Sequence, residues 1–292
     1  MRVIVAVLVM SVTTAVGQSI AAKGLEAWPV PIEQRIFAGS FAREGGPAEL
    51  RLVGCRNEYV SGQLAVRDNR DGSLAVKVSA LRGARGEEIP ADAVRVRFGA
   101  YLPVDETGQL TADPLLPRPT HALTANIAQP IWLTIRVPRT TRRDNYAGYL
   151  ALTTGAAELK VPLSVEVLDA TLPDPTAWSF NLNAWQDPNG IARAHRVALW
   201  SEAHWRLIAA YGRNLAEHGC RAITTSILHD PWNSQAGYEF PAMVEWRYPG
   251  EWKRGGASRF EWDFRIFDRY VATMIESGVK QKIEMFSMVK GP

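Results

Sequence analysis

Residues 159–167 read Leu159-Lys160-Val161-Pro162-Leu163-Ser164-Val165-Glu166-Val167, so that a branched apolar side chain occupies every second position. Successive side chains of a β-strand point to opposite faces, and this period of two predicts a strand with one buried face. Toward the N-terminus the same alternation returns in residues 74–79, 94–98 and 131–137. Half-buried strands are typical of antiparallel sheets that pack on one another. About seven such runs, separated by turn clusters, predict an antiparallel β-sandwich over residues 30–169.

The pattern changes after residue 169. Residues 170–177 contain two prolines, and we interpret them as a stiff linker. Beyond them the sequence predicts a strand at 178–185, a helix from an N-cap at Ser201 to Gly219, a strand at 222–228, a helix capped by Asp263 and ending at Gly278, and a strand at 282–289. This order is typical of βα units around a parallel sheet.

Residues 178–292 are too few for a closed barrel. A (β/α)8 barrel takes about 250 residues, whereas this part holds two complete βα units and the start of a third. The predicted fold is therefore a β-sandwich followed by the first two to three βα units of a truncated (β/α)8 barrel. Either the sequence is a piece of a longer protein or its α/β half is incomplete.

Composition excludes several classes of protein. The 292 residues carry 33 basic and 30 acidic side chains, a net charge of +3, so binding of nucleic acid or a membrane surface through charge is not expected. The sequence contains no phosphate-binding glycine loop and no nucleophile elbow, and we expect no cofactor and no metal. Cys55 and Cys220 are too few for a disulfide framework and are interpreted as buried free thiols. The sequence does not indicate an oligomeric state.

The N-terminus predicts an exported protein. Met1-Arg2 gives a positive start, residues 3–16 are apolar, and Ala15-Val16-Gly17 supplies the small side chains that a signal peptidase reads. The apolar run is shorter than the roughly 20 residues of a membrane span, and no later segment can span a bilayer. We expect residues 1–17 to be a cleavable signal peptide and the protein to be secreted or periplasmic. The alternatives are an uncleaved anchor or a lipoprotein, but no cysteine follows the run.

Candidate binding residues follow the predicted strands of the α/β part, where parallel α/β folds bind ligands. Polar groups beside tryptophan suit sugar recognition, because the apolar face of a pyranose stacks on an indole while amides, carboxylates and imidazoles bind the hydroxyls. Most of the ten tryptophans also lie in this part. The predicted sugar-binding residues are Asn183, Trp185, Asp187, His229, Asp230, Trp232 and Asn233.

Structural roles compete with these assignments. Trp232, which follows a proline, is as well suited to cover the end of the sheet as to bind sugar. Asp230 is as well suited to accept hydrogen bonds from loop amides as to contact the substrate. His229 and Asp230 lack a second histidine or carboxylate at metal-ligand spacing, so a metal site is not expected. Asn183 and Trp185 alternate with an alanine and so point the same way, into a barrel or into a buried core.

Six stretches resemble glycoside hydrolase family 123. Three are similar to the N-terminal sandwich of that family: residues 56–63 (RNEYVSGQ), 113–117 (DPLLP) and 129–138 (QPIWLTIRVP). Three are similar to the opening strands of its barrel: residues 182–188 (LNAWQDP), 227–233 (ILHDPWN) and 286–289 (FSMV). Each motif is moderately specific, but their order and spacing cover nearly the whole mature chain.

The resemblance implies a secreted, retaining β-N-acetylgalactosaminidase-like enzyme that acts on glycans containing N-acetylhexosamine. In that family the acetamide oxygen of the substrate attacks the anomeric carbon, an Asp orients the acetamide, and a neighbouring Glu protonates the leaving oxygen. The resemblance places this pair on a later strand, beyond Pro292. Asp105-Glu106 is an adjacent Asp–Glu pair, but it lies in the predicted sandwich, so no catalytic residue is assigned. This chain alone is expected to be inactive.

Two alternatives remain at the level of sequence. The first is a non-catalytic carbohydrate-binding or degenerate surface protein whose partial barrel binds glycans without turnover. The second is an adhesion or assembly domain that uses the edge strands of the sandwich.

Overall fold

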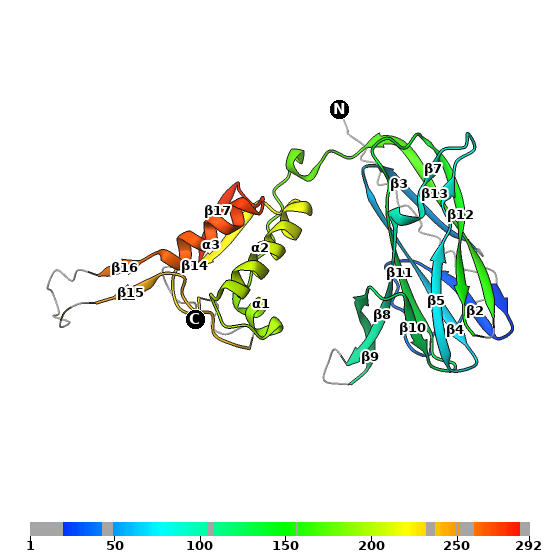
Figure 1. The fold of residues 1–292 in the computed structure, drawn as a ribbon, viewed down its shortest axis with the longest axis horizontal. Coiled ribbons are helices and arrows are strands. Elements are labelled where there is room, and N and C mark those ends of the chain that lie inside the picture. The colour runs from blue at the N-terminus through cyan, green and yellow to red at the C-terminus, as the bar shows by residue number, and fades with distance from the viewer. Residues whose placement is uncertain are drawn as a thin grey trace, which may run out of the picture. The chain divides into compact units, whose positions relative to one another are not determined.

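The structure is a computed structural model, which describes residues 20–42, 49–103, 108–155, 157–231, 237–248, 250 and 260–286 (Figure 1). The chain divides into two compact units, Met1–Leu172 and Pro173–Pro292. Residues 1–17, the predicted signal peptide, lie outside the described residues. In the described part of the chain, no helix is long and apolar enough to cross a membrane.

The first unit contains a six-stranded antiparallel sheet. Its order is β1 (Ile20–Ala22), β2 (Leu25–Val30), β4 (Tyr59–Asp68), β11 (Gln129–Arg136), β8 (Val94–Pro103) and β9 (Leu110–Leu116). The long central pair, β4 and β11, is in register from Tyr59–Arg136 to Val66–Gln129.

A second, seven-stranded sheet belongs to the same unit. Its main path is β10 (Thr120–Leu123), β5 (Gly72–Val78), β12 (Asp144–Thr153), β13 (Glu158–Thr171) and β3 (Leu50–Arg56), and the short β6 (Leu81–Arg82) and β7 (Glu88–Ile89) pair beside β12. A 3-10 turn, η1 (Ala91–Ala93), precedes β8.

One pair of strands departs from the antiparallel arrangement that the sequence predicts. β3 runs parallel to β13, with Leu50 opposite Leu163 and Val53 opposite Glu166. The period of two reports which face of a strand is buried and carries no information on strand direction. No hairpin joins these two strands, so nothing local forces them to be antiparallel.

The alternating residues form one core between the two sheets. Side chains of β11 and β13 are fully buried there at every second position: Ile131, Leu133, Ile135, Val161, Leu163 and Val165. Each such side chain contributes about 1.5–3 kcal/mol by leaving water. The unit has more strands than the sequence predicts, because β1, β6, β7 and β10 have two to four residues and are too short to show a period.

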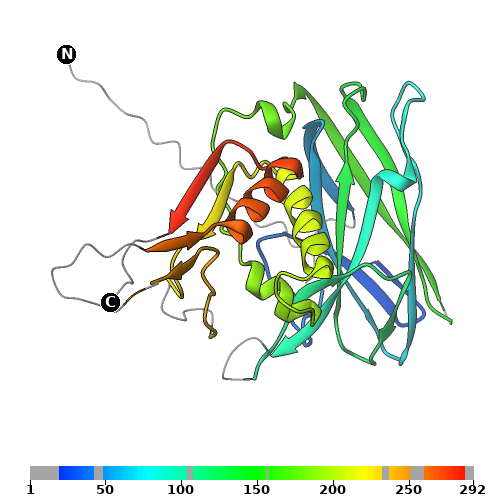
Figure 2. The same cartoon turned by 60° about the vertical axis from the view of Figure 1, so that its left-hand side comes forward.

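Among its described residues, the second unit contains three α-helices and two strand pairs. The helices are α1 (Pro188–His195), α2 (Glu202–Glu217) and α3 (Arg265–Glu276). β14 (Ala222–Ser226) runs parallel to β17 (Lys282–Phe286), and β15 (Glu245–Arg247) runs antiparallel to β16 (Glu261–Asp263). Figure 2 shows α2 and α3 on one side of the β14–β17 pair. Their shared core contains Trp205, Ile208, Ile223, Tyr270 and Met274.

The sequence predicted two helix starts, at Ser201 and Asp263, and two helix ends, at Gly219 and Gly278. The structure confirms all of them except the start at Asp263. The Ser201 hydroxyl caps α2 by accepting a bond from the His204 N–H, and Gly219 and Gly278 have the positive φ of C-terminal glycines. Asp263 is not itself the cap, because α3 begins one residue later than predicted. Its carboxylate instead accepts from the backbone N–H of Arg265.

Three predicted segments differ from the observed ones. Within 178–185, a range that is described throughout, the only β-structure is an isolated parallel bridge from Leu182 to Cys220. The strand predicted at 222–228 ends at Ser226. The predicted linker is partly strand, since β13 continues to Thr171, and residues Pro175–Ala177 form the 3-10 turn η2.

Both cysteines are free, but only one is buried. Cys220 is enclosed in the core of the second unit, whereas Cys55 on β3 is partly exposed. The expectation of two buried thiols was therefore wrong for Cys55, which lies near the end of an edge strand of its sheet.

His204 joins α1 to α2. Its ring is fully buried, Nδ1 accepts a bond from the Trp200 N–H at 3.0 Å, and Nε2 donates to the Pro188 carbonyl at 2.8 Å. A backbone N–H only donates and a carbonyl only accepts, so the ring is neutral with its proton on Nε2. Burial accordingly lowers the pKa of His204.

Replacing His204 by leucine removes the hydrogen bonds to the Trp200 N–H and to the Pro188 carbonyl, and we expect this change to lower the free energy of unfolding by about 2 kcal/mol. Because the folded pKa is lowered, the contribution of the imidazole is present above its ordinary pKa and is lost as pH falls through the folded value. Urea unfolding at pH 7.5 and 5.5 measures both effects. The exposed His218→Leu variant is the control, and a His204→Leu variant that keeps the full acid sensitivity of the wild type would contradict this role.

Candidate functional site

The C-terminal ends of the parallel strands meet at one edge of the second unit. β14 ends at Ser226, β17 ends at Phe286, and the bridge at Leu182 brings a third segment alongside β14 in the same direction. The residues that follow Leu182 and Ser226 contain all seven predicted sugar-binding residues. Trp232 and Asn233 lie outside the described residues, so the structure places five of the seven.

Asn183 and Trp185 reach across β14 to contact β17. The Asn183 amide donates to the Glu284 carboxylate at 2.6 Å, and the Trp185 ring meets the Phe286 ring edge-on, with centroids 4.9 Å apart. The two contacted residues, Glu284 and Phe286, are two positions apart on β17 and therefore point to the same face of the sheet. The side chains that contact them lie on that face as well. Trp185 keeps 62% of its surface exposed.

Small side chains on β14 make this crossing possible. Thr224 and Ser226 are the register partners of Glu284 and Phe286 and therefore share their face of the sheet. The Thr224 hydroxyl is buried and, among the described residues, has no hydrogen-bond partner. The face thus holds an unused hydroxyl beside a carboxylate.

Glu284 is a functional candidate that the sequence reasoning did not single out, because it lies inside a predicted strand rather than after one. Hydrogen bonds from Lys282 and then from Asn183 lower the pKa of its carboxyl group. It is therefore an anion at neutral pH and accepts hydrogen bonds. A charged residue at an alternating position of a short parallel strand was the signal that could have identified it.

Gln186 completes the edge of β14 with its side chain. Its Nε2 donates to the Ala222 carbonyl at 3.1 Å, and its Oε1 accepts from the Thr224 N–H at 2.6 Å. A neighbouring parallel strand would make this pair of bonds with one peptide unit. The buried Gln186 amide replaces that peptide, which explains how the edge of β14 is paired although residues 183–185 form no ladder.

Asp187 has a structural role at the start of α1. One carboxylate oxygen accepts from the Gly190 N–H at 2.8 Å as the N-cap, and the other accepts from the Tyr238 hydroxyl. The bond to Asp187 raises the pKa of Tyr238. The guanidinium of Arg193 lies 4.5 Å above the Tyr238 ring. Both oxygens of Asp187 are thus occupied within the protein.

Residues 238–240 connect the loops that follow the first two strands. The Asn189 amide donates to the Glu239 carbonyl at 2.7 Å. The Glu239 carboxylate lies 3.2 Å from Nε2 of His229, and both of these side chains are well exposed. Sequence periodicity could not identify this segment, because three residues outside any helix or strand carry no repeat.

Asp230 is held by the same segment. Its backbone N–H donates to the Phe240 carbonyl at 2.6 Å, its φ is +47°, and it is 3% exposed. Aspartate tolerates this left-handed conformation better than most residues. Asp230 therefore shapes the loop from within, while the neighbouring His229 faces solvent.

The arrangement combines an exposed indole, an anionic carboxylate, an amide and an exposed imidazole–carboxylate pair. These groups offer a stacking surface together with donors and acceptors, as a polar ring-shaped ligand requires. In the part of the chain that the structure describes, no cluster of three or more His, Cys, Asp or Glu residues is placed to hold a metal ion.

Comparison with known families agrees with this architecture. A model of the glycoside hydrolase family 123 catalytic domain matches residues 185–290, and a model of the family's N-terminal domain matches residues 42–154. The two matches cover most of the chain in the order expected for the family. The chain belongs to glycoside hydrolase family 123.

A solved structure supports the same fold. A family 123 glycoside hydrolase from Clostridium perfringens, described as hydrolysing glycolipid glycans, superimposes with a TM-score of 0.75 at 19% identity. The match covers 85% of this chain and 45% of the clostridial one, so the chain spans less than half the length of that enzyme.

Other structural matches are partial. A PapD-like domain of human CEP192 (13% identity, 47% of this chain, 99% of that domain) and the CooA pilin subunit from enterotoxigenic Escherichia coli (16% identity, 44% and 92%) each give a TM-score of 0.24, which carries no argument. No curated protein matches the sequence significantly.

Replacing Gln186 by methionine keeps the side-chain volume and removes both bonds to β14. The Thr224 N–H loses its partner and the Ala222 carbonyl keeps only a weak bond from the Cys220 thiol, so we expect the second unit to be destabilised by about 2 kcal/mol. Chemical denaturation followed by tryptophan fluorescence measures the loss. The exposed Gln281→Met is the matched control, and equal stability of the two variants would disprove the role given to the Gln186 amide.

Proposed function

We propose that this protein is a secreted, retaining glycoside hydrolase of the β-N-acetylgalactosaminidase type, and that the residues after its parallel strands bind the sugar. The observation that carries the proposal is the exposed Trp185 ring beside Asn183 and Glu284 on one face of the sheet, in a chain of this family. An indole next to fixed donors and acceptors matches a pyranose, which has an apolar face and an equatorial rim of hydroxyls.

We also propose that β14, β17 and the segment bridged at Leu182 are the first strands of a (β/α)8 barrel. Three features support this: the strands are parallel, α2 and α3 lie on one side of them, and the polar side chains that bind sugar are on the other side. Ligand sites of such barrels lie at the C-terminal ends of the strands, where the candidate residues are found.

The proposed mechanism uses the substrate's own acetamide. Its carbonyl oxygen attacks the anomeric carbon while the bond to the leaving oxygen breaks, and that oxygen takes a proton from a carboxylic acid. Water then attacks the same carbon from the opposite side, the cyclic intermediate opens, and the acid regains its proton. Two displacements retain the configuration, and no nucleophile from the protein is needed.

Glu284 is not suited to be the proton donor in this scheme. A general acid at neutral pH needs a raised pKa, whereas Lys282 and Asn183 lower the pKa of Glu284. Residues 173–292 contain no adjacent Asp–Glu pair, and Asp105-Glu106 falls outside the described residues of the first unit. We therefore propose that the catalytic pair is encoded beyond Pro292.

Four described residues then have a binding role, while Asp187 and Asp230 hold the surrounding loops in place. Trp185 stacks on the apolar face of the sugar, and Glu284 and Asn183 accept from and donate to its polar groups. His229, paired with Glu239, donates to a further hydroxyl of the sugar. The second candidate function, a carbohydrate-binding protein without turnover, uses the same residues and rests on the same exposed indole beside an amide and a carboxylate.

Binding tests the site. We expect Trp185→Ala to weaken binding of N-acetylgalactosamine about tenfold, because the stacking surface is lost, and His229→Ala to weaken it less. Phe180→Ala is the matched control, since this aromatic side chain is 56% exposed but lies on the other side of the Leu182 bridge. Isothermal titration calorimetry on the full chain gives the dissociation constants. A His229→Ala variant and a Trp185→Ala variant that both bind like the wild type would overturn the site.

Hydrolysis tests the chemistry. We expect the protein purified from its native source to cleave a nitrophenyl 2-acetamido-β-galactoside, to release the β-anomer first, and to leave the 2-hydroxy analogue intact because the attacking acetamide is missing. Equal cleavage of both substrates, or release of the α-anomer, would exclude the mechanism. The intact mass of that sample, compared with the 32.3 kDa of this sequence, reports on signal cleavage and on residues beyond Pro292.

A further inference from the structure

β15 and β16 form a hairpin with two chemically different faces. Trp246 is paired with Trp262, while the neighbouring pairs are Glu245–Asp263 and Arg247–Glu261. Because side chains alternate along a strand, the tryptophans share one face and the charged residues share the other. The hairpin projects from the helices of the second unit (Figure 1).

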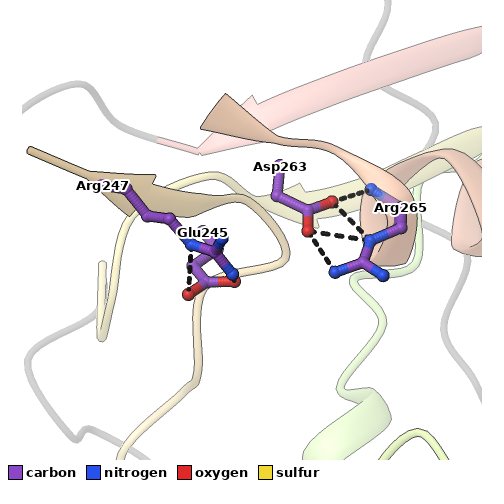
Figure 3. Close-up of polar contacts among 4 residues, drawn as sticks. All are labelled: Glu245, Arg247, Asp263 and Arg265. Carbon is purple, nitrogen blue, oxygen red and sulfur yellow. Dashed lines mark hydrogen bonds and ion pairs between the residues drawn. The ribbon is translucent and has the colours of Figure 1, made fainter. Parts of the chain in front are cut away.

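Two carboxylates of the charged face are held in ion pairs. Arg247 donates two hydrogen bonds of 2.9 Å to the Glu245 carboxylate. Arg265 donates hydrogen bonds of 2.8 and 2.5 Å to the Asp263 carboxylate (Figure 3). The bond from Arg265 lowers the pKa of Asp263 to about 2. Arg247 likewise lowers the pKa of Glu245, so both of these carboxylates are anions at neutral pH and are suited to contact water.

The opposite face is entirely aromatic. The Trp246 and Trp262 rings meet at 82° with centroids 6.1 Å apart, and Phe260 contacts both Trp246 and Tyr248. Such cross-strand pairs contribute roughly 0.2–1 kcal/mol each and help a short hairpin that is marginal by itself. Holding the strands together does not require exposure, yet Trp246 is 41% exposed and Trp262 is 52% exposed.

The aromatic face is fixed beside the proposed sugar site. Nε1 of Trp246 donates to the carbonyl of Ile227 at 2.9 Å, and Ile227 is the first residue after β14 and lies two positions before His229. The base of the hairpin is thus anchored to the loop that carries the exposed imidazole. The other tryptophan of the pair, Trp262, makes no hydrogen bond within the described residues, and about half of its side chain is exposed to solvent.

We propose that the aromatic face of β15 and β16 is a second sugar-binding platform, which stacks a pyranose of an oligosaccharide that extends beyond the terminal N-acetylhexosamine. The inference rests on the proposed function and adds a preference for longer glycans. A sugar fits better than an anionic membrane, because the arginines of the hairpin are on the other face and are already paired with carboxylates. The bond from Trp246 to the carbonyl of Ile227, two positions before His229, also places the aromatic face next to the loop that carries the proposed sugar-binding imidazole.

The test compares two ligands on the full chain: N-acetylgalactosamine, and a linear tetrasaccharide ending in β-linked N-acetylgalactosamine. We expect Trp262→Ala to weaken binding of the tetrasaccharide about tenfold and to leave the monosaccharide unchanged, and Trp262→Tyr, which keeps a ring, to lie between. Glu261→Ala is the matched control on the same strand, since it perturbs the hairpin from the charged face and should bind both ligands like the wild type.

The outcomes separate this inference from the proposed function. If Trp262→Ala binds the tetrasaccharide normally while Trp185→Ala weakens both ligands, the platform is wrong and the site stands. If Trp262→Ala alone weakens the tetrasaccharide, the platform stands and the strand-end site falls. Equal weakening of both ligands by Trp262→Ala would mean that the hairpin only supports the site. Trp262-dependent sedimentation with anionic vesicles, without any effect on glycans, would replace the sugar with a membrane surface.

Discussion

The second unit depends on how the inner edge of β14 is paired. A buried strand must find partners for its peptide groups on both sides, because each unpaired one costs about 1–3 kcal/mol. β17 serves one side, and the bridge from Leu182 together with the amide of Gln186 serves the other. Ending the backbone ladder at Leu182 frees the next residues to leave the sheet, so that Asn183 and Trp185 extend over β14 and Asp187 starts a helix. The Leu182 bridge and the Gln186 side chain thus pair the edge of β14 on either side of the candidate residues Asn183 and Trp185.

The sequence predicted what depends on local periodicity and missed what depends on tertiary pairing. Alternation located the long strands of the sandwich, and the serine and glycine caps located α2, since both signals lie within a few residues. The direction of β3 and the shortness of the first strand of the second unit are decided by partners far along the chain. Cys55 was wrongly expected to be buried for the same reason. The sequence around a cysteine does not show whether its strand lies at the edge of a sheet or in the core.

The site was predicted unevenly. The placement of Asn183 and Trp185 on one face followed from their spacing, and their contacts with Glu284 and Phe286 agree with it. Glu284 itself was missed because a strand interior was read as packing alone. Residues 238–240 were missed because their effect is to join two loops, which no linear pattern encodes. Family resemblance supplied the proposed reaction, while the contacts show that hydrogen bonds from Lys282 and Asn183 lower the pKa of Glu284, which argues against this residue as the proton donor.

The two-faced hairpin has a consequence for how this protein can vary. Which side of β15 and β16 is aromatic depends only on whether a residue stands at an even or odd place along its strand. The connection between the strands can change length without altering that parity. One residue inserted within 245–247 would instead turn the tryptophan of β15 to the charged side and leave Trp262 without its partner. Lineages of such a protein are therefore free to lengthen the tip but not to shift the strands.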